Sequence, residues 1–480
     1  MPTTPTTVVL FGATGDLARR KLLPGLLHLF ETGLLQEVRV VGTSLDDHTR
    51  DSFVDLARSS VEEHGTETDL EAWPEFAKRL HWAPGSGGAP ALRAAVEEAE
   101  QEAGWDGPVS RLHYLSVPPK AALAVVRLLH DCQLVEHSRI VMEKPFGTDL
   151  ASAQELNRQL HEVFDESQIF RIDHFLGKEA AQNILAFRFA NGLFEPIWHR
   201  NHIDHVQIDV PESLGLEQRA SFYEATGAYR DMVVTHLFQV LAFTAMEPPT
   251  ALEPFAISEE KFKVFRSLKP IEPHDVVRGQ YVGYRDEEGV ADDSETETFV
   301  ALRCFIDNWR WAGVPFYLRT GKKMPEGARI ISIAFKEPPR SMFPEGSGVG
   351  DHGPDHLTFD LADQAKMSLS FYGKRPGPGM RLDKLSMQFA MHDTGWAGAV
   401  LEAYERLIYD AARGDRTLFT SAQGIERLWE VSTPLLENTP VVRPYGVGTW
   451  GPNQVHQLIA PYAWRLPFER GWRDPNSVGS

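Results

Sequence analysis

The first third of the chain alternates short β-branched apolar runs with stretches whose apolar residues recur at helical spacing. In one helical stretch, for example, Leu123, Val126 and Leu129 fall on one face. This alternation predicts a doubly wound parallel sheet with crossover helices. We expect strands at residues 7–11, 39–41, 111–115 and 139–142, helices at 16–32 and 120–131, and a Pro/Gly-rich surface loop at 84–90.

The pattern changes after about residue 171, and from residue 298 onward strand-like runs follow one another. Strands without intervening helices predict an antiparallel sheet. We expect strands at 298–305, 314–319, 329–335, 356–361, 366–371 and 385–389, flanked by helices that include 229–244 and 404–412. The predicted fold is therefore an α/β Rossmann domain at residues 1–176, followed by a β+α domain with a large antiparallel sheet at residues 177–480.

Length and composition agree with a two-domain globular protein. A chain of 480 residues exceeds one ordinary core, and no apolar run is long enough to cross a bilayer. The N-terminal residues do not resemble a secretory signal, so we expect a cytoplasmic protein with no membrane role. Cys132 and Cys304 lie far apart in apolar surroundings, which favours buried reduced thiols over a disulfide or a metal ligand.

The net charge of −19 disfavours nucleic-acid binding, which needs a clustered positive field. An anionic substrate would need a local group of Lys, Arg and His on so acidic a protein.

The segment VVLFGATGDLA, residues 8–18, combines a strand, a glycine turn and a helix start. Gly12 and Gly15 allow the backbone to approach a pyrophosphate, and Ala18 takes the helix-packing position. The helix N-terminus would add amide donors. An ordinary strand-to-helix turn has the same pattern, but its place at the start of an α/β domain favours a nucleotide. The predicted cofactor-binding residues here are Gly12, Ala13, Thr14, Gly15, Asp16 and Leu17.

Three further segments carry candidate substrate chemistry. RIDHFLGKE begins at Arg171, and His174 and Lys178 face one anion if a helix begins there; a phosphomonoester would reward such paired donors. The alternative is a helix start with solvated charges. EKPFG begins at Glu143 after a strand, with a candidate cis bond before its proline, although a plain turn fits too. His236 lies on an apolar helix, where it is either a core residue or a general base.

Together these segments resemble the glucose-6-phosphate dehydrogenase family across essentially the whole chain. The resemblance rests on the order and spacing of GATGDLARRK at Gly12, EKPFG at Glu143, RIDHFLGKE at Arg171, RTGK at Arg319, GDRTLFT at Gly414 and GTWGP at Gly448. It implies oxidation of C1 of glucose 6-phosphate to the 6-phospho-lactone with NAD or NADP and no metal, the first step of the oxidative pentose phosphate pathway. It also implies a homodimer or homotetramer formed through the large sheet.

The resemblance also implies a role for each candidate residue. His236 would be the general base, with Asp173 holding its imidazole. His174 and Lys178 would bind the 6-phosphate. The remaining substrate-binding residues would be Lys322 and Lys144, which extend the cationic patch, and Glu212 and Asp231, which hold sugar hydroxyls; Lys144 would also contact the coenzyme. Phe175 and Gly327 depart from the family, which commonly has a tyrosine and a basic residue there.

Coenzyme choice follows from the end of the second strand, where Ser44 and Leu45 are further predicted cofactor-binding residues. NADP-using members usually have an arginine in place of Leu45. Here Asp46 and Asp47 place carboxylates near the 2′ position, which suits a ribose hydroxyl and repels a phosphate. We therefore predict a preference for NAD. The alternative is that Arg50, or Arg19 or Lys21 on the first helix, reaches a 2′-phosphate.

Other functions also remain open. An oxidoreductase of the glucose-fructose oxidoreductase type carries Glu-Lys-Pro after a Rossmann strand, but its usual Gly-x-Gly-x-x-Gly turn is absent here. A related dehydrogenase acting on another hexose phosphate would keep the same residues. A non-catalytic sugar-phosphate-binding paralogue is disfavoured because His236, Asp173 and Lys178 are all present.

Overall fold

The structure is a computed structural model that describes residues 4–105, 107–216, 219–350, 353–362, 366–390 and 401–465. The chain folds into two compact units. The first unit comprises Met1–Lys178, Pro249–Glu259 and Gly398–Glu426, and the second comprises Glu179–Pro248, Glu260–Ala397 and Arg427–Ser480. Each unit is therefore built from segments that lie far apart in the sequence.

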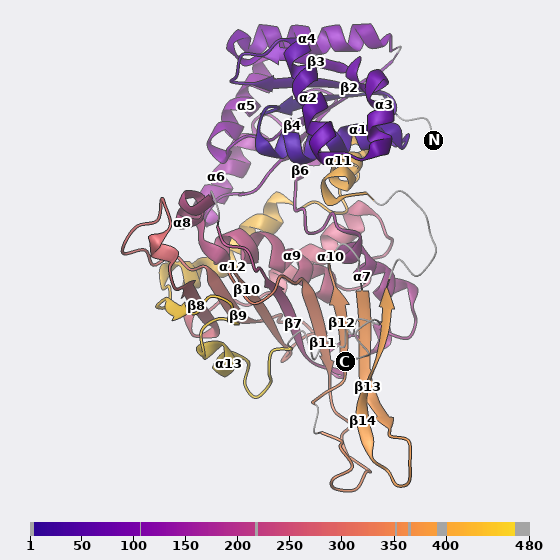
Figure 1. Ribbon diagram of the computed structural model, residues 1–480, viewed down its shortest axis with the longest axis vertical. Coiled ribbons are helices and arrows are strands. Elements are labelled where there is room, and N and C mark those ends of the chain that lie inside the picture. The colour runs from indigo at the N-terminus through magenta and orange to yellow at the C-terminus, as the bar shows by residue number, and fades with distance from the viewer. Residues whose placement is uncertain are drawn as a thin grey trace. The chain divides into compact units, whose positions relative to one another are not determined.

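Among its described residues, the first unit forms a six-stranded parallel sheet in the order β3-β2-β1-β4-β5-β6 (Figure 1). The strands are β1 (Thr6–Phe11), β2 (Val38–Ser44), β3 (Leu80–Pro84), β4 (Ser110–Leu115), β5 (Ser138–Met142) and β6 (Ile169–Arg171). Every residue of β1 is buried, as expected for a strand covered by helices on both faces. The strand order reverses between β1 and β4, and such a reversal opens a ligand crevice at the carboxyl ends of the strands.

Helices pack on this sheet in two groups. The helices of this unit are α1 (Leu23–Glu31), α2 (Arg50–His64), α3 (Glu67–Ala77), α4 (Gly88–Ala103), α5 (Pro119–Asp131), α6 (Leu150–His161) and α11 (Ala403–Arg413). α1 contacts α2, α3 and α11, whereas α5 contacts α4 and α6. A π-helical turn, Ala18–Leu22, leads from the glycine turn into α1.

The second unit is built on a larger mixed sheet, whose described strands run in the order β14-β13-β12-β11-β7-β10-β9-β8-β15. The strands are β7 (Ile203–Pro211), β8 (Val276–Tyr281), β9 (Phe299–Phe305), β10 (Pro315–Gly321), β11 (Ile330–Phe335), β12 (His356–Asp360), β13 (Lys366–Lys374), β14 (Leu382–Ala390) and β15 (Arg443–Tyr445). Most neighbours are antiparallel, but β7 with β10 and β8 with β15 are parallel.

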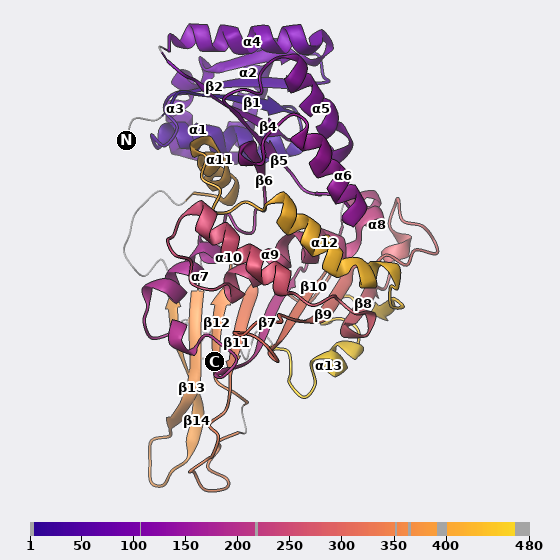
Figure 2. The same ribbon diagram turned by 180° about the vertical axis from the view of Figure 1, so that it is seen from behind.

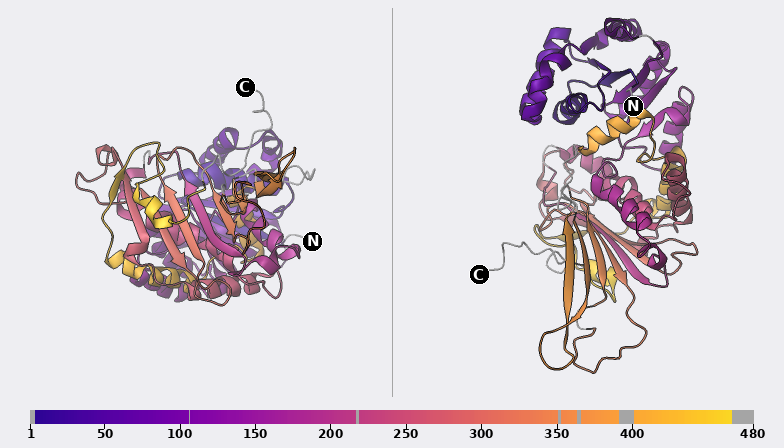
Figure 3. Two further views of the ribbon diagram at one scale, coloured as in Figure 1. Left: turned by 90° about the horizontal axis from the view of Figure 1, so that it is seen from below. Right: turned by 90° about the vertical axis from the view of Figure 1, so that its right-hand side faces the viewer.

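A helical layer lies on one face of this sheet (Figures 2 and 3). The helices of the second unit are α7 (Glu179–Ala190), α8 (Ala220–Ala228), α9 (Phe238–Ala245) and α13 (Gln454–Ile459), while α10 (Pro254–Ser267) and α12 (Ala422–Glu437) contain residues of both units. Between α8 and α9 the segment Tyr229–Leu237 is π-helical and contacts β10. This segment carries His236.

The predicted fold class is confirmed, with differences in detail. The expected antiparallel sheet contains two parallel pairs. The expected loop at 84–90 is wrong in its second half, because α4 begins at Gly88. Pro90 is tolerated there since amide groups in the first helical turn have no intrahelical acceptor.

None of the helices in the described part of the chain combines the length and the apolar character that crossing a bilayer requires.

Candidate active site

The glycine turn after β1 is shaped by close backbone contacts. Gly12 has a φ of +73°, and a Cβ on it would lie 2.1 Å from the backbone oxygen of Ser116. The N–H groups of Gly12 and Ala13 donate to the Thr43 carbonyl at 2.9 and 3.2 Å, and the Gly15 N–H donates to the Gly12 carbonyl at 2.9 Å. A bare backbone turn at the carboxyl end of β1, followed by a helix start, fits the pyrophosphate of a dinucleotide.

Replacing Gly12 by alanine is expected to destabilise the first unit and weaken coenzyme binding. The variant combines a positive φ with a steric clash. Gly104, at the end of α4, also has a positive φ, but among the described residues no atom lies within 4 Å of an added Cβ. The control should lose about 1 kcal/mol of unfolding free energy, and Gly12→Ala clearly more. Thermal unfolding and coenzyme titration measure both effects. Equal losses for the two variants would contradict the role given to the clash.

The carboxyl end of β2 carries a polar turn beside this crevice. The Thr14 hydroxyl donates to the Asp46 carboxylate at 2.5 Å, and the Asp46 N–H donates to the Ser44 hydroxyl oxygen at 3.1 Å. The Leu45 side chain is 99% exposed. Asp46 thus connects the end of β2 to the glycine turn. A carboxylate in this place hydrogen-bonds a ribose hydroxyl in many dinucleotide-binding domains.

Two of the three basic residues near this turn, Arg50 and Lys21, have other partners. The Arg50 guanidinium donates to both carboxylate oxygens of Glu102 at 3.0 Å and to the carbonyl of Leu80 at 2.8 Å. Leu80 begins β3, at the opposite end of the strand from the crevice. Hydrogen bonding to Arg50 lowers the pKa of Glu102, so this pair stays charged. Lys21 pairs with Glu402 at 2.7 Å.

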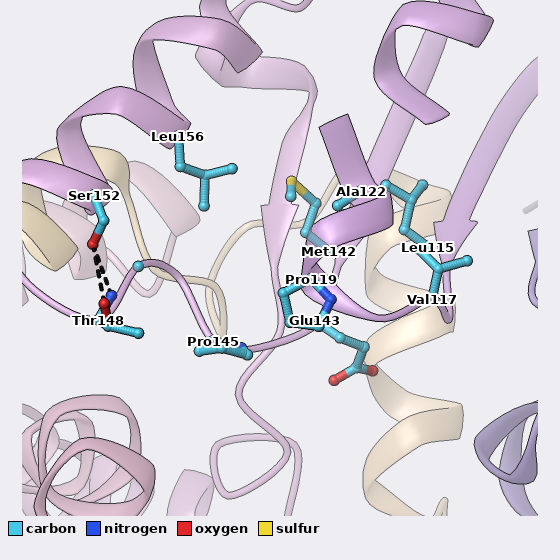
Figure 4. Close-up of a pocket in the computed structure, with 11 residues that line it drawn as sticks. Leu115, Val117, Pro119, Ala122, Met142, Glu143, Pro145, Thr148, Ser152 and Leu156 are labelled. Atoms are coloured by element: carbon cyan, nitrogen blue, oxygen red, sulfur yellow. Dashed lines mark hydrogen bonds between the residues drawn. The ribbon is translucent and has the colours of Figure 1, made fainter. Parts of the chain in front are cut away.

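A pocket of about 160 Å³ lies at the carboxyl ends of β4 and β5 (Figure 4). Its wall is mostly apolar and is formed by Leu115, Val117, Pro119, Ala122, Met142, Glu143, Pro145, Gly147, Thr148, Ser152 and Leu156. The Tyr114 hydroxyl donates to Glu143 at 2.6 Å, and burial raises the pKa of Glu143. The peptide bond between Lys144 and Pro145 is cis, as predicted. Lys144 follows β5 by two residues, and its neighbours Glu143 and Pro145 both line this pocket.

The segment from Arg171 to Lys178 begins at the last residue of β6 in the first unit. The buried Arg171 side chain donates to Glu166 and Asn157, each at 2.8 Å, which fixes the start of the segment. Asp173 is only 4% exposed, and the His174 ring stacks on Tyr404 with ring centres 6.0 Å apart. Tyr404 did not stand out in the sequence, because it reaches His174 only through the docking of α11.

The condition set for His174 and Lys178, a helix that begins there, is not met, because α7 begins only at Glu179. The Asp173 carboxylate instead accepts the N–H of Phe175 at 2.9 Å, a local bond that favours a turn over a helix. The two cationic residues thus lie on one irregular turn, both in the first unit.

Tyr223 of the second unit lies beside three predicted site residues, Glu212, Asp231 and Lys322. Lys322, just after β10, forms a 2.5 Å ion pair with Glu212, just after β7. The Lys322 ammonium also lies 5.7 Å from the centre of the Tyr223 ring. Burial, together with the negative charges of Asp231 and Glu212, raises the pKa of Tyr223 well above its ordinary value. Tyr223 was missed in the sequence because an isolated tyrosine on a helix gives no signal.

His236 is 1% exposed and Asp231 7% exposed, and both lie on the π-helical segment. Wide helical turns of this kind are frequent at functional sites. Asp173 belongs to the first unit and His236 to the second, so their pairing stays a prediction.

Comparison with known proteins bears on this arrangement. A family model described as the glucose-6-phosphate dehydrogenase NAD binding domain matches residues 9–183, and one described as its C-terminal domain matches residues 185–467. The glucose-6-phosphate 1-dehydrogenase of Rhizobium meliloti is 41% identical, covering 96% of this chain and 97% of that protein. The enzyme of that name from Chlamydia muridarum is 39% identical, with coverage of 96% and 97%.

Solved structures agree with these sequence relatives. A glucose-6-phosphate 1-dehydrogenase from Mycobacterium avium superimposes with a TM-score of 0.85 at 36% identity, covering 97% of this chain and 99% of that one. A glucose-6-phosphate dehydrogenase in complex with its substrate glucose-6-phosphate gives a TM-score of 0.88 at 31% identity, with coverage of 96% and 98%. The chain belongs to the glucose-6-phosphate dehydrogenase family.

Proposed function

We propose that the protein is an oxidoreductase that converts glucose 6-phosphate to 6-phosphoglucono-lactone while reducing a nicotinamide dinucleotide, the first step of the oxidative pentose phosphate pathway. The observation that carries this proposal is the match of both family models along nearly the whole chain. The bare glycine turn of the first unit and the cluster of Glu212, Asp231 and Lys322 in the second supply the polar groups that such a reaction needs.

His236 is the general base of the proposed reaction. Its imidazole takes the proton of the C1 hydroxyl as that oxygen becomes the lactone carbonyl, and Asp173 orients and stabilises the imidazolium. When bound, the nicotinamide ring supplies the acceptor for the hydride that leaves C1. The buried position of His236 supports this role because it keeps competing water away from the proton transfer.

The sugar is held at both ends in this proposal. His174 and Lys178 bind the 6-phosphate, and Lys144 and Lys322 extend the positive field. A local cationic group is needed because the whole chain carries a net charge of −19. Glu212 and Asp231 accept hydrogen bonds from sugar hydroxyls. The residues at 177–480 are assigned to substrate binding and to assembly as a homodimer or homotetramer, which light scattering would test.

NAD is the proposed preferred coenzyme. Two contacts and one side chain support it: Asp46 is held at the crevice by Thr14, Arg50 is bound to Glu102, and the exposed Leu45 carries no charge. A carboxylate there accepts a hydrogen bond from a ribose hydroxyl and repels a 2′-phosphate dianion.

The coenzyme proposal predicts a higher kcat/KM with NAD than with NADP in the natural protein. Leu45→Arg should improve kcat/KM for NADP by about tenfold, the worth of one charge-assisted hydrogen bond, and Leu45→Gln should not. Asp46→Asn should weaken discrimination against NADP by removing the repelling charge. A native preference for NADP would reject the proposal, and an arginine without effect would show that Leu45 lies away from the 2′ position.

The proposed function itself is tested by following coenzyme reduction with purified protein and glucose 6-phosphate, compared with mannose 6-phosphate, galactose 6-phosphate and free glucose. We expect the highest kcat/KM for glucose 6-phosphate. A higher value for another hexose phosphate would indicate the related dehydrogenase. Tight binding of sugar phosphate by calorimetry without turnover would indicate the non-catalytic paralogue.

A further inference from the structure

The backbone turn that carries Lys322 is held by the C-terminal part of the second unit. The Tyr445 hydroxyl donates to the Lys322 carbonyl at 2.8 Å, and the Gly448 N–H donates to the Lys323 carbonyl at 2.8 Å. The Lys322 N–H donates in turn to the Thr298 carbonyl at 2.9 Å. The Tyr445 and Gly448 donors lie at and beside the GTWGP motif, to which the proposed reaction gives no role.

The same turn is tied to the loop that carries Glu212. The Glu212 N–H donates to the Gly321 carbonyl at 2.9 Å, the Met324 N–H donates to the Glu212 carbonyl at 2.9 Å, and the Lys323 N–H donates to the Leu214 carbonyl at 3.0 Å. Lys323 itself adopts a positive φ of +48°, so the chain bends sharply directly after Lys322. Backbone hydrogen bonds therefore fix the main-chain positions of both partners of the 2.5 Å ion pair.

Tyr445 is suited to hold this turn rigidly. It is 4% exposed and ends β15, which pairs in parallel with β8. Its hydroxyl also lies 3.0 Å from the Thr298 hydroxyl, and its ring packs on Phe299 with centres 5.6 Å apart. Burial raises the pKa of Tyr445 above its ordinary value, so the hydroxyl keeps its proton and stays a donor.

We infer that Tyr445 is a positioning residue for phosphate recognition: its hydroxyl fixes the turn from which Lys322 presents its ammonium group to the sugar phosphate. The inference rests on the proposed function, in which Lys322 contributes to binding the 6-phosphate. It assigns the C-terminal segment 445–448 a part in substrate specificity, although no residue of that segment is placed against the substrate. A hydroxyl that acts through Lys322 should affect a phosphorylated sugar more than free glucose. Because Glu212 is hydrogen-bonded to the same turn, we expect a smaller effect on free glucose as well.

Tyr445→Phe removes the hydroxyl alone and provides the test. We expect KM for glucose 6-phosphate to rise about three- to tenfold, kcat to stay within about twofold, and KM for free glucose to rise by less than about twofold. Tyr284→Phe is the matched control: it removes another buried tyrosine hydroxyl of this unit, which donates to Glu224 at 2.7 Å. The control should leave both KM values unchanged.

A double-mutant comparison with Lys322→Met separates positioning from general destabilisation. If Tyr445 acts through Lys322, Tyr445→Phe has no further effect on KM in the Lys322→Met background. Equal rises of KM for glucose and glucose 6-phosphate, full additivity, or equal effects in Tyr284→Phe would overturn the inference. Titration calorimetry with both sugars repeats the comparison without turnover. Unaltered glucose 6-phosphate binding in Lys322→Met alone would reject the role proposed for Lys322, and the inference with it.

Discussion

His236→Asn is expected to lower kcat by about a hundredfold to ten-thousandfold, because the amide cannot accept the proton of the C1 hydroxyl. Asparagine keeps a polar group of similar size at the buried position, so glucose 6-phosphate binding should change only by a small factor. Steady-state rates and titration calorimetry measure the two quantities on the same protein.

The matched control is His205→Asn, which also replaces a buried histidine of the second unit. His205 is 2% exposed and lies on β7, with its ring 3.0 Å from Asp204. This variant should lose stability but keep kcat close to that of the natural protein. Near-normal kcat in a folded His236→Asn protein, or equal losses of kcat in both variants, would contradict the assignment of His236 as the general base.

Lys178→Ala is expected to weaken the binding of glucose 6-phosphate about tenfold to a hundredfold. This is the contribution of one charge-assisted hydrogen bond to the phosphate. Free glucose, used at high concentration, should be affected far less because it lacks the phosphate. The ratio of kcat/KM for the two sugars measures the effect.

Lys120→Ala controls for the loss of one positive charge in the first unit, since Lys120 is exposed on α5. Lys120→Ala should leave kcat/KM for both sugars unchanged. Lys178→Arg should recover part of the affinity for glucose 6-phosphate that Lys178→Ala loses. Equal losses for glucose and glucose 6-phosphate in Lys178→Ala would contradict phosphate binding by this residue.

The strands could be predicted where apolar runs are continuous. The prediction failed where polar side chains are buried. β1 is apolar apart from two threonines, and its bounds are found nearly as predicted. β7 was missed, although its apolar and polar residues alternate as they do in a strand. Such alternation indicates one solvent-exposed face, whereas His205, Gln207 and Asp209 are all buried. Asp209 is buried because Arg319 binds it with two hydrogen bonds, a partner more than a hundred residues away that local spacing cannot indicate.

The sequence indicated candidate site residues one by one but not the contacts between them. The family resemblance implied Glu212 and Lys322 separately, and only the folded second unit pairs them. The bond from Thr14 to Asp46 likewise depends on the pairing of β1 with β2. A helix does not begin at His174, because the hydrogen bond from the Phe175 N–H to the Asp173 carboxylate competes with helix formation.

The central claim is that a hydride leaves C1 of glucose 6-phosphate for the coenzyme. The most direct test supplies glucose 6-phosphate deuterated at C1 and follows the label by mass spectrometry. We predict one deuterium in the reduced coenzyme, an unlabelled lactone hydrolysed to 6-phosphogluconate, and no label in the solvent. Label in the solvent, or no coenzyme reduction by folded protein with either NAD or NADP, would contradict the account.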